Sequence, residues 1–305
     1  MLERDAGLEK YSVETSEGYL PVVDSEVFYS QKGTPYLKHP GLVLLSVPHV
    51  DIRGLKGFLK GFPPEYKFIE YLEDPTPLPP AENLCKTAGQ LCYMSFGPKR
   101  SMNADAWKYF DGAKSSGHGS ILEHANFSFL VYGASRAFTH ELVRHRAGAG
   151  YSQVSQRYVS GATLRFVEGE EYQGDGVLHK MFEDWVDKAG EEYEARIQRL
   201  IELQQQGGVI LTGETKTDLR KKVQQAARSC LPNETEAPIV VTANVRAWRH
   251  IVNMRASEHA AVEIRRVAFD IWRCLVTVSP ILFGDFTPVH LPDGTHAITT
   301  PYPKV

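Results

Sequence analysis

An Arg-His-Arg run at residues 144 to 146 is followed at once by "AGAGYSQVSQR", a stretch rich in glycine, hydroxyl and amide groups. A guanidinium can hold a phosphate through two parallel hydrogen bonds, and hydroxyl and amide side chains suit the edge of a planar heterocycle. Gly148 and Gly150 have no side chains, so backbone N–H groups there can approach a ligand closely. This pattern predicts a site for a phosphorylated heterocycle, with Arg144 and Arg157 as the phosphate-binding candidates.

The residues before this run predict the element that positions it. Residues 134 to 146 have helical spacing and no breaker before the glycines. Arg136, His140 and Arg144 would then share one face of a helix, because residues four apart are neighbours on its surface. Such a face can equally be solvated and balanced by Glu141. The ligand-type groups that follow favour the binding site.

A second polar set lies in residues 238 to 276, which predict a short apolar lead-in and one helix of about eight turns. Its members are Asn244, Arg246, His250, Asn253, Arg255, Ser257, His259 and Glu263. On an unbroken helix, Arg246 and Arg255 lie half a turn out of phase and serve two different pockets, as in a symmetric oligomer with shared sites. The alternative is that the histidines are hydrogen-bonded core residues and the arginines ion-paired supports.

The other elements indicate an α-rich α/β protein. Residues 82 to 96 predict a helix that leads into a loop, 124 to 133 a strand, and 182 to 200 part of a long amphipathic helix. Residues 1 to 64 contain short β-type runs such as "GLVLLSVPHV" and no recognisable chemistry. We therefore predict an N-terminal extension of unknown role over residues 1–64 and a catalytic domain over residues 65–305.

Composition excludes several classes of protein. The 305 residues carry a net charge of -3 with no basic tail, which argues against nucleic acid or an anionic membrane as the main partner. The N-terminus is too charged for a signal peptide, and no run of roughly 18 apolar residues follows. The four cysteines lack CxxC spacing, which is typical of reduced thiols. We expect a cytoplasmic protein.

The motifs together identify a family. "RHR" followed by "SQR", with "GHGSILEH" upstream and "NVRAWRHIVNMRASEHAAVEIR" downstream, resembles the flavin-dependent thymidylate synthases. The resemblance covers roughly residues 80 to 280, and the order of its elements is specific. It implies an α/β fold with long central helices and a small antiparallel sheet, and a homotetramer with shared active sites. It also implies FAD as cofactor, methylenetetrahydrofolate as carbon donor, NADPH as reductant and dUMP as substrate.

The resemblance assigns roles residue by residue. Implied FAD contacts are Ser95, Ser120, Arg144, His145, Arg146, Gln153, Asn244, Arg246 and His250. Implied nucleotide contacts are Glu141, Arg144, Gln153, Val154, Ser155, Gln156, Arg157, Arg228 and Arg255. His118 matches a position near the folate and the flavin, and Arg255 matches the residue that activates uracil.

The chemistry of uracil supports the role of Arg255. C5 of uracil becomes a better nucleophile when negative charge on N3 and O4 is stabilised, which a guanidinium can do although it cannot act as a base. A hydride must come from the reduced flavin, since no side chain supplies one. Ser155 has no histidine spaced for a catalytic triad, so we predict that it binds substrate and is not a nucleophile.

One departure from the family concerns the spacer. Seven residues separate "RHR" from the serine in the family, whereas eight, "AGAGYSQV", do so here. The extra residue is either a tolerated insertion or part of a longer, more pliable loop that leaves room for a 2′-hydroxyl. The second interpretation predicts methylation of UMP as well as dUMP, as in relatives that serve nucleoside-antibiotic pathways.

Two other classes of function remain open. A nonenzymatic nucleic-acid-binding module could use the same Arg/His stripe, although the acidic net charge argues against it. A metal-dependent nucleotide hydrolase could use His118 and His124, but no third ligand stands at a convincing spacing, so we expect no metal.

Overall fold

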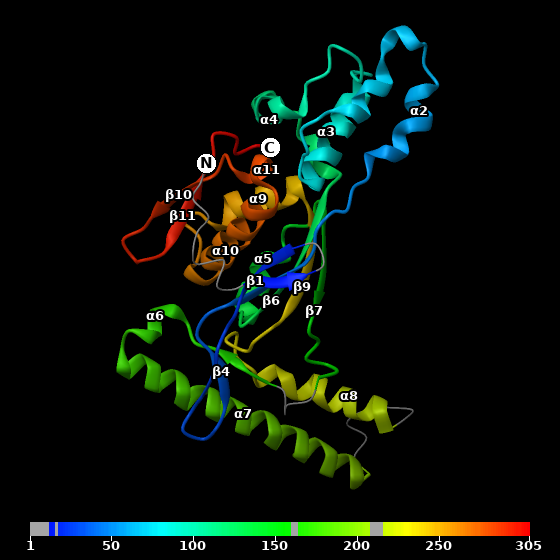
Figure 1. Ribbon diagram of the computed structural model, residues 1–305. Helices are drawn as coiled ribbons and strands as arrows, with labels where there is room; N and C mark the ends of the chain where they lie inside the picture. Colours follow the sequence, from blue (N-terminus) through cyan, green and yellow to red (C-terminus); the bar gives the residue numbers. More distant parts are fainter. Residues whose placement is uncertain (1–11, 16–17, 160–163, 208–215) are drawn as a thin grey trace.

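A six-stranded antiparallel sheet, in the order β1-β2-β5-β6-β9-β7, runs through the middle of the described residues (Figure 1). The computed structural model describes residues 12–15, 18–159, 164–207 and 216–305. The strands are β1 Ser12–Thr15, β2 Gly18–Val23, β3 Val27–Tyr29, β4 Pro35–Leu37, β5 Gly41–Ser46, β6 Asn126–Tyr132, β7 Ala149–Gln153, β8 Phe166–Val167, β9 Ile239–Asn244, β10 Thr287–His290 and β11 His296–Thr299. The predicted α/β fold with an antiparallel sheet is confirmed.

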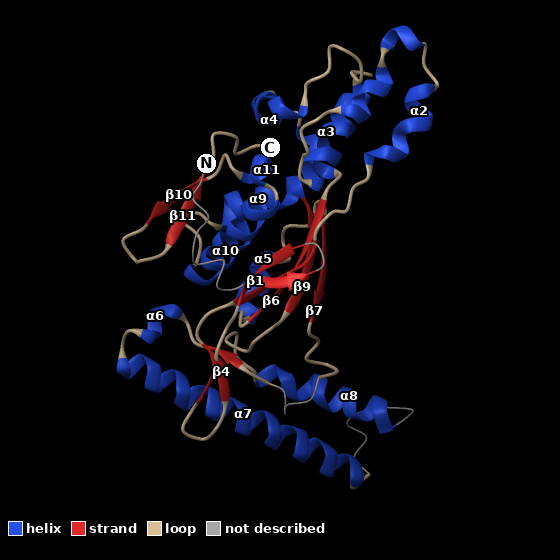
Figure 2. Cartoon of the chain, in the orientation of Figure 1, coloured by secondary structure: helices blue, strands red, loops and turns tan. Residues whose placement is uncertain are grey.

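Helices lie beyond both ends of the sheet and along one of its faces (Figure 2). The α-helices are α2 Lys56–Lys60, α3 Pro80–Cys92, α4 Ala106–Ser115, α5 Arg136–Leu142, α6 Glu170–Gln173, α7 Gly176–Gln205, α8 Lys216–Ala227, α9 Val245–Arg255, α10 Val262–Val278 and α11 Pro280–Phe283. Short 3-10 helices are η1 Ile52–Leu55, η2 Pro64–Tyr66, η3 Phe68–Glu73, η4 Asn103–Asp105, η5 Gly119–Glu123 and η7 Arg228–Cys230.

The main core lies between the sheet and helices α9 and α10. Alternate residues of β6, namely Phe127, Phe129 and Val131, are buried, as the period of two in a half-buried strand requires. Trp248 of α9 packs edge-on against Phe129, and its indole N–H donates to the Phe127 carbonyl at 3.1 Å. This contact fixes the helix that carries much of the predicted site directly on the sheet.

Three elements predicted from periodicity are confirmed. The helix expected at 82 to 96 is α3, the strand expected at 124 to 133 is β6, and the amphipathic helix at 182 to 200 lies within α7. Helix α7 begins after Asp175, whose carboxylate accepts hydrogen bonds from two N–H groups of the first turn.

The single helix expected over most of residues 238 to 276 is wrong. The apolar lead-in forms β9, and the helix is divided into α9 and α10 by a turn after Arg255. At this turn the Ala256 carbonyl accepts a hydrogen bond from the Ile298 N–H of β11 at 2.8 Å, and the Ala260 N–H bonds to the Ser257 carbonyl instead. The Ala256 carbonyl, which the Ala260 N–H would bond to in a continuous helix, is therefore bonded to a distant strand instead.

The helix expected over residues 134 to 146 ends earlier, so Arg144 lies outside it. Helix α5 stops at Leu142, and a turn at Val143 and Arg144 leads into His145 and Arg146, which are in neither helix nor strand. The Tyr151 hydroxyl contacts the carbonyls of Leu142 at 3.2 Å and His145 at 2.6 Å, which holds this turn against β7. Because "AGAG" leads into β7, most of the spacer is paired with β9 and does not form a free loop.

Strands from the first 64 residues extend the sheet. β5 pairs with β6, and β2 pairs with β5. β3 and β4 form a hairpin that pairs with β8, and Tyr36 of β4 packs edge-on against Phe182 of α7. The hydrogen-bonded sheet thus crosses the predicted boundary at residue 64. A separate role for the first segment stays a prediction.

Two smaller observations bear on the class of protein. In the described part of the chain, no helix is both long enough and apolar enough to cross a membrane. All four cysteines are free thiols, as expected from their spacing.

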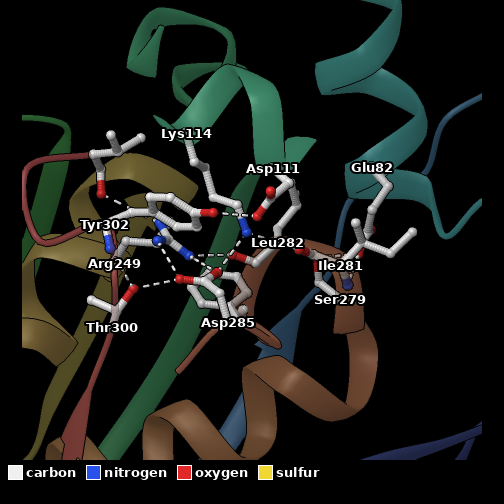
Figure 3. A network of polar contacts seen from close by, with 12 residues as sticks. Glu82, Asp111, Lys114, Arg249, Ser279, Ile281, Leu282, Asp285, Thr300 and Tyr302 are labelled. Carbon is white, nitrogen blue, oxygen red and sulfur yellow. Dashed lines mark hydrogen bonds and ion pairs between the residues drawn. The ribbon is translucent and has the colours of Figure 1, made fainter. Parts of the chain in front are cut away.

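Glu82 of α3 is a fully buried carboxyl group that joins α3 to α11 (Figure 3). The Ser279 hydroxyl and the Ile281 N–H donate to its Oε1 at 2.8 and 3.1 Å, while Oε2 has no partner among the described residues. Burial raises the pKa of Glu82 to about 7, because the charged form loses its hydration.

This shift predicts that Glu82 makes stability fall as the pH rises. Between pH 4.5 and about 7 the folded protein binds more protons at this group than the unfolded chain does. The free energy of unfolding should therefore fall by about 3 kcal/mol across this interval and then level off. Glu82→Gln removes the ionisation and keeps the accepting oxygen.

Urea unfolding at pH 5 and pH 8 tests this, with the wild type and Glu82→Gln measured side by side. Other titrating groups act in both proteins, so the difference between them isolates Glu82. We expect the variant to gain stability relative to the wild type at pH 8 only. An equal difference at both pH values would contradict the shift.

Candidate active site

Arg255, Glu141 and His145 form a connected group where α9 ends beside α5. The Arg255 guanidinium donates to the Glu141 carboxylate at 2.8 Å, to the Glu141 carbonyl at 3.2 Å and to His145 Nε2 at 2.8 Å. Arg255 belongs to the downstream motif, whereas Glu141 and His145 lie in or beside the Arg-His-Arg run, so this group joins segments that are distant in the sequence. The contacts hold the guanidinium in one orientation before any ligand binds.

His145 is neutral in this arrangement. Burial, the Arg255 charge and His250 lower the pKa of His145 to about 4. The His250 ring lies edge-on to it at 5.4 Å. Because His145 Nε2 accepts a hydrogen bond from Arg255, its ring proton must lie on Nδ1 at neutral pH. His145 therefore acts as a second support for Arg255.

Asn244 and Gly148 form the next part of the site. Asn244 caps the N-terminus of α9, and its Oδ1 accepts from the Ala247 N–H at 2.9 Å. Gly148 has φ +70°, and a Cβ there would lie 2.6 Å from Asn244 Nδ2. The first glycine of the long spacer is thus required both by its backbone conformation and by contact with a predicted FAD residue.

Arg246 lies near the start of α9 and contacts a different part of the chain. Its guanidinium donates to Glu123 at 2.5 Å. A Cβ on Gly119 would be 2.8 Å from Arg246 Nε, so the backbone between His118 and Ser120 lies directly against this side chain. Arg246 and Arg255 therefore serve different contacts on one helix, as their half-turn separation predicts.

The loop after β7 carries the other predicted nucleotide residues. The Ser155 hydroxyl accepts from the Arg157 N–H at 3.3 Å, and the exposed Arg157 guanidinium lies over the Tyr158 ring. Gln156 is buried, and its Nε2 has no partner among the described residues. Val154 and Gln156 line a cavity of about 780 Å³ that also includes Arg165 and Glu236.

The remaining predicted residues differ in how far they are exposed to solvent. Arg144, Arg146, His118, Ser120 and His250 are exposed. Ser95, Gln153 and Arg228 are partly buried, in the turn after α3, in β7 and in η7. The cavity beside Gln156 is lined by none of the Arg-His-Arg residues and not by Arg255.

Sequence reasoning missed two residues of this site. Glu123 neutralises Arg246, and Gly119 permits the close contact with Arg246. Both residues lie inside the "GHGSILEH" motif, which was the available signal. Gly148 was expected to allow a close approach, and the structure places it against Asn244. Within the described ranges, no group of three or more metal-ligating side chains gathers.

Comparisons with known proteins identify the family of this chain. Residues 72–281 match the family described as thymidylate synthase complementing protein. The flavin-dependent thymidylate synthase of Mycobacterium sp. (strain KMS) is 44% identical over 218 residues, covering 72% of this chain and 85% of that protein. That of Mycolicibacterium gilvum (strain PYR-GCK) is 44% identical over 219 residues, covering 72% and 84%.

The flavin-dependent thymidylate synthase of Mycobacterium tuberculosis (strain ATCC 25177 / H37Ra) is 43% identical over 222 residues, covering 72% of this chain and 84% of that protein. The family predicted from the two motifs is thus confirmed, and with it the prediction of a methyltransferase enzyme. The chain belongs to the family of flavin-dependent thymidylate synthases, described as thymidylate synthase complementing proteins.

Proposed function

We propose that this enzyme uses FAD to methylate C5 of a uridine nucleotide reductively, converting dUMP to dTMP. Methylenetetrahydrofolate donates the carbon, and NADPH reduces the flavin. Support comes from the names of the relatives and from the motifs. The observation that carries the proposal is the Arg255 guanidinium, held by Glu141 and neutral His145.

Arg255 is the residue to which we assign the activation of uracil. A guanidinium remains protonated in proteins, so it acts by stabilising negative charge that develops on N3 and O4. A donor that is already oriented needs little reorganisation when this charge appears. Glu141 and His145 supply that orientation, and Ser155 and Arg157 bind the nucleotide.

The residues predicted to hold FAD suit that cofactor. Arg144, Arg146 and Arg246 provide cations for its diphosphate, and Asn244 and His250 provide neutral polar groups. The close packing at Gly119 and Gly148 brings backbone near these side chains. When bound, reduced FAD supplies the hydride that no side chain can supply.

We further propose a homotetramer in which neighbouring chains share each active site. Small-molecule sites normally bury most of their ligand, whereas Arg144, Arg146 and His250 are exposed on one chain. A second copy facing these residues would enclose the ligand. The four free cysteines fit an enzyme of the reducing cytoplasm.

Reconstitution with FAD, followed by an assay with dUMP, folate and NADPH, tests the proposed function. We expect a flavin absorption band in the purified protein and formation of dTMP. Colourless protein that cannot be reconstituted would favour the nucleic-acid-binding alternative, with its steep salt dependence. Loss of activity with chelators would instead favour a metal-dependent hydrolase.

The eight-residue spacer supports a broader substrate range. Residues 149–153 of the spacer form β7 and pair with β9, so its unpaired residues are those at the two ends of the strand, including the turn at Gly148. We propose that this change leaves room at the sugar for a 2′-hydroxyl, so that UMP is methylated as well as dUMP. Nucleoside-antibiotic biosynthesis would use such a product.

Side-by-side turnover of UMP and dUMP by the same FAD-loaded enzyme tests this proposal. We expect 5-methyl-UMP as well as dTMP, with kcat/KM values within about a hundredfold of each other, since one hydroxyl accommodated in a pocket changes discrimination by about that much at most. Product from dUMP and none from UMP would refute the broader range and leave the proposed function standing.

A further inference from the structure

Asp285 follows α11 and gathers two buried cations. Its carboxylate accepts two hydrogen bonds from Arg249 at 2.7 and 2.9 Å, one from Lys114 at 2.6 Å and one from the Thr300 hydroxyl at 2.5 Å. Figure 3 shows these side chains pointing toward Asp285 from separate elements. We call Lys114, Arg249, Asp285 and Thr300 the Asp285 clamp.

One arm of the clamp leads to His118. Lys114 lies in the last turn of α4, and Gly117, two residues after the helix ends, has φ +72°. The Gly117 N–H donates to the Lys114 carbonyl at 3.1 Å and the His118 N–H to the Ala113 carbonyl at 2.9 Å, the pair of bonds that defines a Schellman cap. The backbone of His118 is therefore fixed relative to Lys114.

The other arm lies on α9. Arg249 is almost fully buried and is three residues from Arg246, which faces Gly119 and Glu123 instead. Its guanidinium also donates to the Leu282 carbonyl at 2.6 Å and stacks over the Phe286 ring. The buried side of α9 is thus held by the clamp, while Arg246 and His250 remain exposed.

Asp285 is in direct contact with both buried cations of the clamp. Burial by itself raises the pKa of Asp285, but the hydrogen bonds and charges of Arg249 and Lys114 hold it at about 2. Without the Asp285 carboxylate between them, the Lys114 and Arg249 charges would repel each other. Asp285 therefore links α4 and α9 through a single carboxylate.

We infer that Asp285 is a positioning residue, which holds α4 and α9 at the spacing that places His118, Gly119 and Ser120 against Arg246. The inference rests on the proposed function, since it gives the clamp a role in presenting the FAD site. The clamp residues are not among those predicted to contact a ligand; in this inference they act through the two helices that carry Lys114 and Arg249.

Lys114→Met tests this inference, because it removes one arm and leaves Asp285 paired with Arg249. Thr300→Val is a milder second variant that removes one hydrogen bond from Asp285. The control is Val186→Ala, which truncates a buried side chain in the separate cluster between α7 and the β3–β4 hairpin. FAD affinity, kcat and KM for dUMP, and amide exchange over residues 113–124 are measured for each protein.

We expect Lys114→Met to weaken FAD binding about tenfold and to lower kcat more than it changes KM for dUMP. Amide exchange at 113–124 should quicken in Lys114→Met, and less so in Thr300→Val, but not in Val186→Ala. If FAD affinity and amide exchange are unchanged in both clamp variants, the positioning role is overturned and the proposed function still stands. Wild-type protein that binds no FAD would overturn the proposed function and the positioning role with it.

If Lys114→Met does not fold, Thr300→Val decides the question by the same measurements. Equal losses in Thr300→Val and Val186→Ala, at equal loss of stability, would show that the clamp is only structural.

Discussion

Replacing Arg255 with alanine should lower turnover of the uridine nucleotide on the order of a thousandfold while FAD remains bound. The variant loses the fixed positive group that stabilises charge on uracil, whereas the predicted FAD contacts on α9 and η5 keep their own partners. Stopped-flow reduction of the flavin and steady-state product formation separate these two outcomes.

Two variants control for the loss of a guanidinium. Arg255→Lys keeps the charge but cannot reproduce the fork that contacts Glu141 and His145, so it should recover only part of the activity. Arg266→Ala removes an arginine of α10 that is paired with Glu170 of α6, and it should leave turnover near the wild-type value. Near wild-type turnover by Arg255→Ala would show that the assignment is wrong.

The same replacement has an effect that needs no ligand. Burial is the largest cause of the low pKa of His145, and the Arg255 charge is the next. Arg255→Ala should therefore raise the pKa of His145 from about 4 toward its ordinary value, without reaching it, because the ring stays half-buried. NMR titration of the histidine ring protons measures this change.

Gly148→Ala should lower the free energy of unfolding by about 1–3 kcal/mol and weaken FAD binding about tenfold. An alanine at φ +70° is strained, and its Cβ would lie 2.6 Å from Asn244 Nδ2. Asn244 would have to move, and it both caps α9 and belongs to the predicted FAD site. Urea unfolding and titration with FAD measure the two effects.

Gly150→Ala is a matched control two residues further along the same spacer. The nearest atom to a Cβ at Gly150 is the Thr242 carbonyl oxygen at 4.0 Å, which is ordinary contact. This variant should be as stable as the wild type or slightly more stable, since alanine restricts the unfolded chain. If Gly148→Ala behaved like Gly150→Ala, the turn at Gly148 would not constrain the site.

The family, the main motifs and several elements could be predicted from the sequence because they depend on local patterns. Alternating apolar residues identified β6, and helical periodicity identified α3 and α7. The motifs named the residues that gather around α9, including Arg255 and Glu141. These features depend on spacing along the chain, which the sequence contains directly.

Where the elements end was decided by tertiary contacts. Helical spacing continues through Arg144 and through the turn after Arg255, so no local signal marks either end. The Tyr151 hydroxyl and the Ile298 N–H come from other strands and bond to carbonyls near these two ends. Local spacing in the sequence cannot predict these bonds, because the donors come from strands that are distant in the chain.

The sequence alone is enough to propose which side chains carry the chemistry, because guanidinium, imidazole and glycine have fixed capacities wherever they lie. Their states depend on the folded chain: His145 is neutral and supports Arg255, Gly148 lies against Asn244, and Asp285 joins α4 to α9. The physical reason is that burial and charge pairing depend on residues that are distant in the chain and adjacent only after folding.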